Sequence, residues 1–357
     1  MKDKILFLTS DEWWDTNITV YPIIQNYISL KVIVLSYSKN NKYPQKKIDG
    51  NIDLIEYKLK YRKRDPRNLV TAFKIWCKIL SLSDHKFVYE YFFDIYLNMF
   101  MSIKMPKESI ITFHNYVLHS DANIFEKIYR KIFLNKVNRF HFYSLDQYHL
   151  FNKEKNIGKE ASYTLMPIKD YGPPVNEQDK ITGETHLLFF GIIRDYKNLK
   201  LLIKAIQEIN NPLIKLTIAG YSNDWNEKYL PLIQDNRCFN LLIRFIDNEE
   251  IPDLFSNADY LVLPYTDTTQ SGPLFIAYNY SLPIIASDIP IFKTYVNNGL
   301  NGFVFENNNL QSLKQTILFS HAQNMESRLK MIENAKTISN EYTIKSNDSI
   351  HKFVSWI

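Results

Sequence analysis

Residues 263–288 read LPYTDTTQSGPLFIAYNYSLPIIASD, and the rest of the chain is organised around this stretch. An apolar strand end leads into a polar loop, and the pair Ser271-Gly272 then opens a helical run before a second apolar strand. Small residues at a helix start leave backbone N–H groups free at the positive end of the helix dipole. Such a loop binds phosphate, although a serine there also fits an ordinary helix cap. Cations brought to the same place would decide between these two interpretations.

Strand and helix alternate around this stretch. An expected strand at residues 186–190 precedes GIIRDYKNLKLLIKAIQEI, in which Gly191 permits a tight turn and Arg194 and Lys197 lie where a helix begins. Cations at a helix start are unfavourable with the helix dipole, so we expect an anion to compensate them. Further strands are predicted from short apolar runs at residues 215–219, 241–246, 260–263, 284–287 and 303–305.

The first half shows the same alternation, with strands predicted at residues 4–9, 31–36, 52–57 and 109–114. The last of these delivers His114 at its carboxyl end, where ligands bind in open α/β sheets. A lone histidine is also often a structural hydrogen-bonding group. The loop SDEWWDTN at residues 10–17 is unusual for a connection, because exposed tryptophan indicates a contact. We expect one tryptophan to pack under the next helix and the other to face a sugar or acceptor. The candidates on this acceptor side are Asp11, Glu12, Trp13, Trp14, Asp15 and His119.

Basic charge is concentrated in the first half, which has a net charge of +8 over residues 1–180 against −3 over residues 181–357. The segment KLKYRKRDPR at residues 58–67 is followed by an aromatic-amphipathic helix, and residues 124–140 read as a second basic-apolar helix. This pattern over residues 58–80 and 124–140 fits an anionic membrane surface. A solvated basic loop before an ordinary core helix remains the alternative. Nucleic acid is not expected, because no reader motif accompanies the charge.

The chain has 357 residues, 45% of them hydrophobic and 23% charged, which predicts a folded protein of two domains. Its two cysteines, Cys77 and Cys238, have no metal-ligand spacing, so we expect a reducing compartment and no zinc site. No apolar run is long enough for a membrane span, and no signal peptide is expected. The stretch from residue 167 to 185 carries three prolines and two glycines, which predicts a linker at residues 171–185. The apolar end at residues 336–357 is expected to be a helix that packs back on the N-terminal domain.

Four segments together carry a family resemblance: GIIRDYK at residues 191–197, LPIIASD at 282–288, GLNGFVF at 299–305 and HNYVLH at 114–119. They resemble GT-B glycosyltransferases of family 4, which build bacterial surface polysaccharides such as capsule, exopolysaccharide or O-antigen. The resemblance implies an α/β fold of two Rossmann-like domains whose parallel sheets face each other across a cleft. Residues 1–170 would bind the acceptor, and residues 186–335 would bind a nucleotide-sugar.

The resemblance also implies roles for individual residues. Arg194 and Lys197 would hold the donor diphosphate with the amides of Ser271 and Gly272, and His114 would lie near the donor sugar as a catalytic residue. The implied donor-binding set is Gly191, Arg194, Lys197, Tyr265, Gln270, Ser271, Gly272 and Pro273. One departure stands out. The stretch resembles a branch that reads PY…QSG…AY, in which the paired glutamates of the usual pattern are replaced here by Thr268 and Ile276.

We therefore expect transfer of a sugar from a UDP- or GDP-linked donor to a glycan or lipid-linked acceptor, in the cytoplasm or on the inner face of the membrane. The family implies retention of configuration. No metal and no cofactor are expected, because Arg194, Lys197 and the amides of Ser271 and Gly272 can stabilise the leaving diphosphate and no DxD pair follows a predicted strand. If the reaction inverts instead, a base is required, and Asp11, Glu12, Asp15 and His114 are the candidates. Two other functions remain open: a catalytically silent GT-B protein that binds a partner transferase or glycan, and a sugar-nucleotide epimerase.

Overall fold

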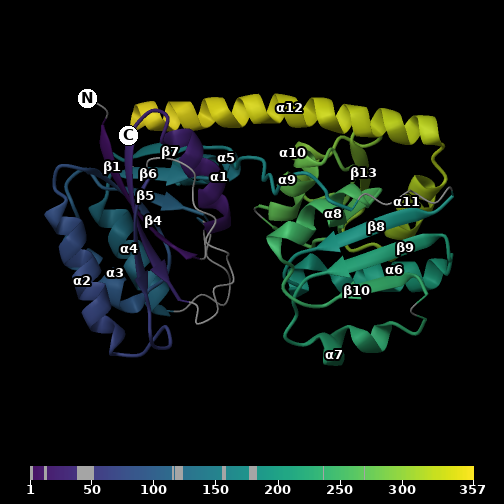
Figure 1. Ribbon diagram of the computed structural model, residues 1–357, viewed down its shortest axis with the longest axis horizontal. Helices are drawn as coiled ribbons and strands as arrows, with labels where there is room; N and C mark the ends of the chain where they lie inside the picture. Colours follow the sequence, from purple (N-terminus) through teal and green to yellow (C-terminus); the bar gives the residue numbers. More distant parts are fainter. Residues whose placement is uncertain are drawn as a thin grey trace. The chain divides into compact units, whose positions relative to one another are not determined.

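The computed structural model describes residues 3–11, 14–37, 52–114, 116, 124–154, 158–176, 183–235, 237–268 and 270–357, without the side chains of residues 14–16 and 18. The chain divides into two compact units (Figure 1). Unit 1 comprises Met1–Pro167 and Ile344–Ile357, and unit 2 comprises Ile168–Thr343. Each unit has a parallel sheet and a hydrophobic core of its own.

Unit 1 contains a seven-stranded parallel sheet in the order β3-β2-β1-β4-β5-β6-β7. The strands are β1 (Lys4–Ser10), β2 (Ser29–Ser36), β3 (Asp53–Lys58), β4 (Lys86–Glu90), β5 (Ile110–Phe113), β6 (Arg139–Phe142) and β7 (Glu160–Tyr163). The helices that connect them are α1 (Trp14–Ile24), α2 (Asn68–Ser81), α3 (Ile95–Ile103), α4 (Ile124–Lys136) and α5 (Leu145–Lys153). A strand followed by a crossover helix is the connection that parallel pairing requires.

Alternate residues of the unit 1 strands serve two packed faces, as the period of two along a strand dictates. Leu6 and Leu8 of β1 join the core formed with α2, α3 and α4. Phe7, between them, packs its ring edge-on against Tyr21 of α1, with ring centroids 5.2 Å apart. The sheet is thus covered on both sides, so its central strands are continuous apolar runs.

Unit 2 contains a six-stranded parallel sheet in the order β10-β9-β8-β11-β12-β13. The strands are β8 (Thr185–Phe190), β9 (Ile214–Ala219), β10 (Phe239–Leu242), β11 (Tyr260–Leu263), β12 (Ile284–Ser287) and β13 (Gly302–Phe305). The helices are α6 (Leu199–Ile209), α7 (Trp225–Lys228), α8 (Ile251–Ser256), α9 (Gly272–Asn279), α10 (Pro290–Tyr295), α11 (Leu310–His321) and α12 (Met325–Trp356). Short 3-10 turns occur at Asp195–Lys197, Leu230–Leu232 and Asn248–Glu250.

Helices α6 and α11 cover one face of the unit 2 sheet, where Leu202, Ile206 and Leu313 are fully buried. On the other face, Phe190 at the end of β8 packs against Phe255 of α8, with ring centroids 5.1 Å apart. Both units are therefore α/β layers with parallel sheets, as the sequence predicts.

The last helix, α12, belongs to both units, because the unit boundary falls at residue 344. In unit 2, the ring of Tyr342 stacks on that of Phe275 in α9, with centroids 5.4 Å apart. In unit 1, Phe353 stacks on His141 of β6 at 3.9 Å, and the hydroxyl of Ser349 accepts a hydrogen bond from the amide of Leu165. The helix begins at Met325, well before the expected 336–357.

Two sequence predictions are wrong in their boundaries. The helix predicted at residues 124–140 ends at Lys136, and the remaining residues form strand β6 from Arg139. The strand predicted at residues 241–246 lies instead at Phe239–Leu242. The latter is an edge strand with half-exposed side chains, so its sequence carries no buried apolar run.

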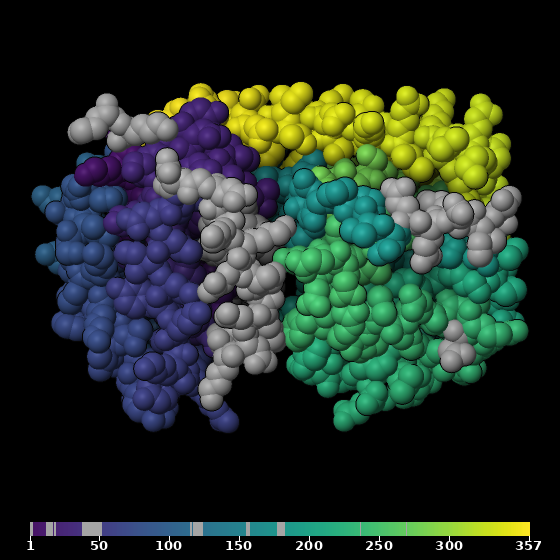
Figure 2. Space-filling model, viewed as in Figure 1, coloured from purple at the N-terminus to yellow at the C-terminus, as the bar shows by residue number. Residues whose placement is uncertain are grey.

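The proline-rich segment expected to be a linker is held against unit 2 as far as the structure describes it. The amides of Val175 and Asn176 both donate to the carboxylate of Asp253 in α8. The hydroxyl of Tyr280 donates to the carbonyl of Gly172. In the space-filling view, this teal segment lies on the green surface of unit 2 (Figure 2). Residues 177–182 of the expected linker lie outside the described residues.

Candidate functional site

The carboxyl end of strand β8 turns at Gly191. This residue has φ +99°, a left-handed backbone that disfavours any side chain, and its amide donates to the carbonyl of Ala219 at the end of β9. A Cβ atom at Gly191 would lie 2.9 Å from Nζ of Lys197 and 3.7 Å from Cγ of Pro273. Gly191, Lys197 and Pro273 therefore meet at one point, and the lysine ammonium fills the space that glycine leaves.

Lys197 ends the 3-10 turn that follows Gly191, and its side chain is buried, at 6% exposure. Its Nζ donates a long hydrogen bond of 3.4 Å to the carbonyl of Phe190 and lies 5.5 Å from the ring centroid of Tyr265. Burial, with a smaller contribution from the positive charge of Arg194, lowers the pKa of Lys197 from its ordinary 10.5 to about 7. An anion at this place would restore the charged form.

Helix α9 begins beside this ammonium. Ser271 is its N-cap, but the serine side chain makes no capping hydrogen bond, and Pro273 in the first turn has no N–H. Among the described residues, the amides of Ser271 and Gly272 meet no acceptor. The Ser271 hydroxyl is buried, at 4% exposure, and also has no hydrogen-bond partner. Buried polar groups without partners are rare in folded proteins, so the Ser271 hydroxyl indicates a place where a ligand can bind.

The phenol of Tyr265 also lies at the start of α9. Its hydroxyl is fully buried and has no hydrogen-bond partner among the described residues, and its backbone carbonyl accepts a 2.6 Å hydrogen bond from Ser287. Burial raises the pKa of Tyr265, although the neighbouring Ser271 hydroxyl lowers it slightly without reaching hydrogen-bonding geometry. We call Lys197, Tyr265, Ser271 and Gly272 the cradle. It combines one cation, two free amides and two free hydroxyls.

Arg194 and Lys169 add positive charge near the cradle. Arg194 is exposed but close enough to Lys197 to lower its pKa. Lys169 is buried, and its Nζ lies 3.7 Å from the position of a Cβ on Gly272. No sequence pattern indicates Lys169, because it lies beside a proline-rich segment and reaches the cradle only through the fold.

The other predicted donor-side residues lie in the loop before α9 or in the helix. The hydroxyl of Thr268 donates to the carbonyl of Gln270 and accepts from its amide, so this loop forms a tight local turn. Ile276 is buried within α9. Neither Thr268 nor Ile276 offers the carboxylate that a glutamate would supply there.

In unit 1, His114 follows strand β5 and is buried at 3% exposure. Its ring lies against that of Tyr143, with centroids 4.6 Å apart, and its carbonyl accepts from the side-chain amide of Gln147. The Tyr143 hydroxyl donates to the buried carboxylate of Glu90, at 2.8 Å. Glu90 and Tyr143 thus form a polar group next to His114. No sequence pattern predicts these two residues at the site.

The remaining acceptor-side candidates are only partly described. Asp11 is half-buried, and its carboxylate accepts from the amide of Tyr37, which lies just after strand β2. Trp14 and Asp15 start helix α1, but their side chains lie outside the description, as do Glu12, Trp13 and His119 entirely.

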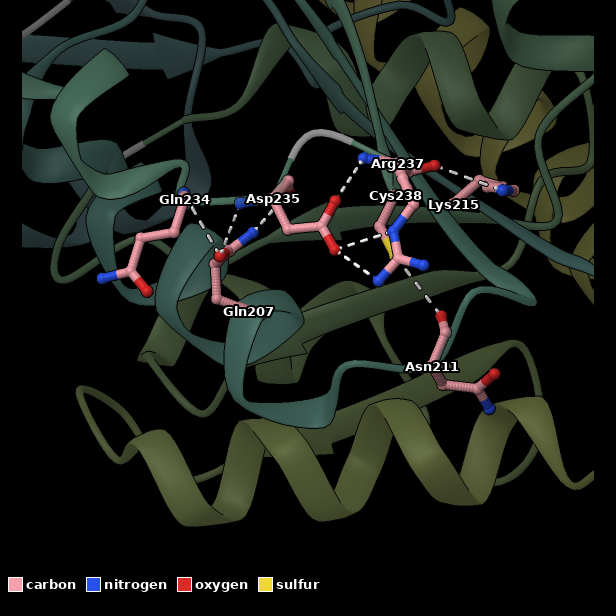
Figure 3. A network of polar contacts seen from close by, with 7 residues as sticks. All are labelled: Gln207, Asn211, Lys215, Gln234, Asp235, Arg237 and Cys238. Atoms are coloured by element: carbon pink, nitrogen blue, oxygen red, sulfur yellow. Dashed lines mark hydrogen bonds and ion pairs between the residues drawn. The ribbon is translucent and has the colours of Figure 1, made fainter.

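A cavity of about 680 Å³ in unit 2 lies away from the cradle, against the starts of β8, β9 and β10. Its cations are already paired. Arg237 forms an ion pair with Asp235, and Lys215 donates to the carbonyl of Arg237, as Figure 3 shows. Gln207 of α6 ties down the same loop by donating to the Asp235 carbonyl. This network holds the edge of the sheet.

Within the described residues, no group of three or more histidine, cysteine, aspartate or glutamate side chains could hold a metal ion. No helix in this part of the chain is long and apolar enough to cross a membrane.

Most of unit 2 matches a known protein family. Residues 175–338 match the family described as glycosyl transferases group 1. They are a glycosyl transferases group 1 domain. This domain contains the whole cradle and Arg194, whereas Lys169 lies just before it.

A curated relative and two solved structures are also similar to this chain. A GDP-mannose:glycolipid 4-beta-D-mannosyltransferase of Xanthomonas campestris is 29% identical over 105 residues, which cover 28% of this chain and 29% of that protein. The match thus spans less than a third of the relative. HepE of Anabaena, solved in complex with UDP, has a TM-score of 0.74 at 12% identity and covers 99% of this chain and 100% of that chain. A glycosyltransferase of Rickettsia africae has a TM-score of 0.73 at 14% identity, with coverage of 99% and 97%. The glycosyl transferases group 1 domain therefore belongs to a chain with the GT-B fold.

Proposed function

We propose that this chain transfers a sugar from a nucleotide-diphosphate donor to a glycan or lipid-linked acceptor in the synthesis of a surface polysaccharide. The observation that carries the proposal is the buried ammonium of Lys197 beside the free amides and the unpartnered Ser271 hydroxyl at the start of α9. A helix start of this kind binds phosphate through its amides and its dipole. The glycosyl transferases group 1 domain agrees with this ligand.

Departure of a nucleoside diphosphate develops negative charge on its distal phosphate. Donors that already point at this charge lower the barrier, because they need no rearrangement during the reaction. Lys197 supplies such a donor, and phosphate binding raises its pKa so that the ammonium stays charged. Arg194, which is exposed beside it, completes a clamp that works without a metal.

The donor is a UDP- or GDP-linked sugar. The Xanthomonas relative is named for GDP-mannose and a glycolipid, and the Anabaena structure contains UDP. GDP-mannose is therefore the first donor to test, followed by UDP-hexoses, each with a lipid-linked sugar as acceptor.

We further propose that the reaction retains the anomeric configuration and that His114 acts on the donor sugar. The anomeric configuration of the product, read by proton NMR against that of the donor, tests retention. An inverted product would make a general base necessary and would direct attention to Asp11 and His114.

The experiment for the function is sugar transfer by purified protein. Loss of one preorganised donor costs about 3–4 kcal/mol of transition-state stabilisation, so Arg194→Ala and Lys197→Ala should each slow transfer by about 100- to 1,000-fold. Lys204→Ala, an exposed lysine on the same domain, is the matched control. Normal turnover in both cradle variants would overturn the clamp.

We also propose that unit 1 docks on an anionic membrane through residues 58–80 and 124–140. The core-facing residues of α2 are Ala72, Ile75 and Ile79. Other apolar side chains of α2, α3 and α4 are exposed. Their exposed fractions are 39–65%, and they are Leu69, Val70, Phe73, Ile103, Ile124, Phe125 and Ile128. Basic residues beside exposed apolar side chains favour the interface of an anionic bilayer.

Liposome flotation tests the docking. The variant Arg62→Gln/Lys63→Gln/Arg64→Gln should lose binding to vesicles with anionic lipid, whereas Lys204→Gln/Lys336→Gln, two exposed lysines of unit 2, should retain it. Equal flotation of both variants would contradict the proposal.

A catalytically silent protein is the second candidate, because Thr268 and Ile276 stand where related enzymes carry glutamates. Such a protein would bind glycan or a partner transferase without turnover. A thermal-shift screen separates the two, because a ligand that binds only the native state raises its apparent stability. No shift with any GDP- or UDP-sugar would favour the silent protein.

A further inference from the structure

Lys169 is the second residue of unit 2 and lies outside the matched domain, yet its ammonium is placed at the cradle. The side chain is 6% exposed, and Nζ lies 3.7 Å from the position of a Cβ on Gly272, the first residue of α9. A cation at a helix start is repelled by the helix dipole.

The backbone next to Lys169 is fixed to the far end of the same helix. The carboxylate of Asp170 accepts from the side-chain amide of Asn279 at 3.0 Å and from the amide of Gly172 at 2.8 Å. The hydroxyl of Tyr280 donates to the carbonyl of Gly172 at 2.8 Å. These contacts hold residues 169–172 along α9, so the position of the Lys169 ammonium is set by the fold.

The same helix start has a second buried ammonium. Lys197 Nζ lies at the point where Gly191 and Pro273 meet, and Pro273 follows Gly272 directly. Two buried lysines thus converge on the first turn of α9, with Arg194 exposed nearby. The Ser271 hydroxyl, 96% buried and without a hydrogen-bond partner, is independent evidence that a ligand with acceptor atoms belongs there.

We propose that Lys169 is a third cationic ligand of the diphosphate, which it binds together with Lys197 and the α9 amides. Three cations match the two to three negative charges of a nucleoside diphosphate, and the anion removes the repulsion between both lysines and the helix dipole. The proposal rests on the proposed function only for the identity of the anion. It places one of the phosphate ligands at the start of unit 2, before the glycosyl transferases group 1 domain begins.

Calorimetric titration of the full chain with inorganic pyrophosphate, GDP and UDP tests the proposal. Lys169→Met keeps the length of the apolar stem and should weaken binding of pyrophosphate and of the nucleoside diphosphate that binds by about tenfold or more, as expected for losing a charge-assisted hydrogen bond. Lys169→Arg should stay within about threefold of the wild type. Lys336→Met, an exposed lysine on α12, should bind as the wild type does. Wild-type affinity of Lys169→Met would overturn the proposal.

A measurement on the wild type covers the case in which Lys169→Met does not fold. In proton–carbon NMR of lysine side chains, the CεH₂ signal absent from Lys169→Arg should shift when pyrophosphate is added, and no shift would overturn the proposal. Binding of pyrophosphate without any sugar transfer would leave Lys169 in place and contradict only the transferase function. A wild type that binds neither pyrophosphate nor a nucleoside diphosphate would overturn both.

Discussion

The position of the missing Cβ of Gly191 lies 2.9 Å from Nζ of Lys197. This distance is too short for two real atoms, so the glycine and the buried ammonium depend on each other. Nζ of Lys197 is the end of a flexible side chain. A larger residue at position 191 would therefore move this ammonium and leave the backbone of the cradle in place. The absence of a side chain at Gly191 therefore determines the position of the Lys197 ammonium.

Gly191→Ala should weaken binding of nucleoside diphosphate by about tenfold, because the methyl group displaces one charge-assisted hydrogen bond. The left-handed backbone at φ +99° should also lower the stability by about 1–3 kcal/mol. Gly299→Ala is the matched control, since Gly299 has φ +80° and no neighbour within 4 Å. It should lose similar stability and retain full binding by calorimetry. Equal binding losses in both variants would show that strain alone is responsible.

Lys197→Met should stabilise the free protein while abolishing diphosphate binding. The pKa of Lys197 falls from 10.5 in the unfolded chain to about 7 in the folded one. The folded state therefore binds fewer protons between these pH values, and wild-type stability rises with pH across this window and is lost as pH falls towards 7. Below pH 7 the full cost of the buried charge remains, on the order of 3–5 kcal/mol.

Thermal unfolding from pH 6 to pH 10 measures this effect. The advantage of Lys197→Met should be largest at pH 6 and should shrink steadily above pH 7. A constant difference across the range would contradict the lowered pKa. Saturating pyrophosphate should reverse the order at pH 6, because only the wild type gains stability from the ligand.

Ser271→Ala should leave the stability within about 0.5 kcal/mol of the wild type, since the hydroxyl makes no hydrogen bond in the free protein. It should still weaken pyrophosphate binding several-fold. Ser287→Ala is the opposite case, because Ser287 donates a buried 2.6 Å hydrogen bond to the carbonyl of Tyr265. Its loss should cost about 1–3 kcal/mol. Urea unfolding followed by calorimetry separates the two, and a stability loss at Ser271 would identify an ordinary helix cap.

The parts of unit 2 that the sequence predicted well are those in which local pattern and burial coincide. Strands β11 and β12 lie within the expected residues because each is a short apolar run between turn residues. Strand β10 was misplaced because an edge strand buries only half of its side chains. The helix predicted at residues 124–140 is longer than α4, because strand β6 follows after only two residues and a basic-apolar pattern continues across them.

The sequence predicts part of the cradle, because a glycine, a lysine and a serine at the ends of strands and helices have specific backbone roles. The sequence does not predict that Lys169 lies at the cradle, because its position depends on Asn279 and Tyr280, more than a hundred residues further along the chain. The group around Glu90 was missed for the same reason. Its partners come from β1, α1 and the end of β6, and no local spacing joins them.

Glu90 gives a prediction that concerns unit 1 alone. Its carboxylate accepts from Asn17 at 2.7 Å, Tyr143 at 2.8 Å and Tyr21 at 3.2 Å, and it is fully buried. Burial raises the pKa of Glu90 above its ordinary 4.5, although the hydrogen bonds from its partners lower it in part. A raised pKa means that the folded state holds its proton more tightly than the unfolded chain.

The stability contributed by this proton is complete below pH 4.5 and is lost as pH rises through the higher pKa of the folded state. Glu90→Gln cannot titrate and keeps nearly the same shape, so its melting temperature should rise relative to the wild type as pH increases from 4.5 to 8. Glu333→Gln, an exposed glutamate on α12, is the control and should follow the wild type at every pH. If Glu90→Gln instead loses stability relative to the wild type as pH rises, the three donors stabilise a charged carboxylate, and burial is the weaker effect.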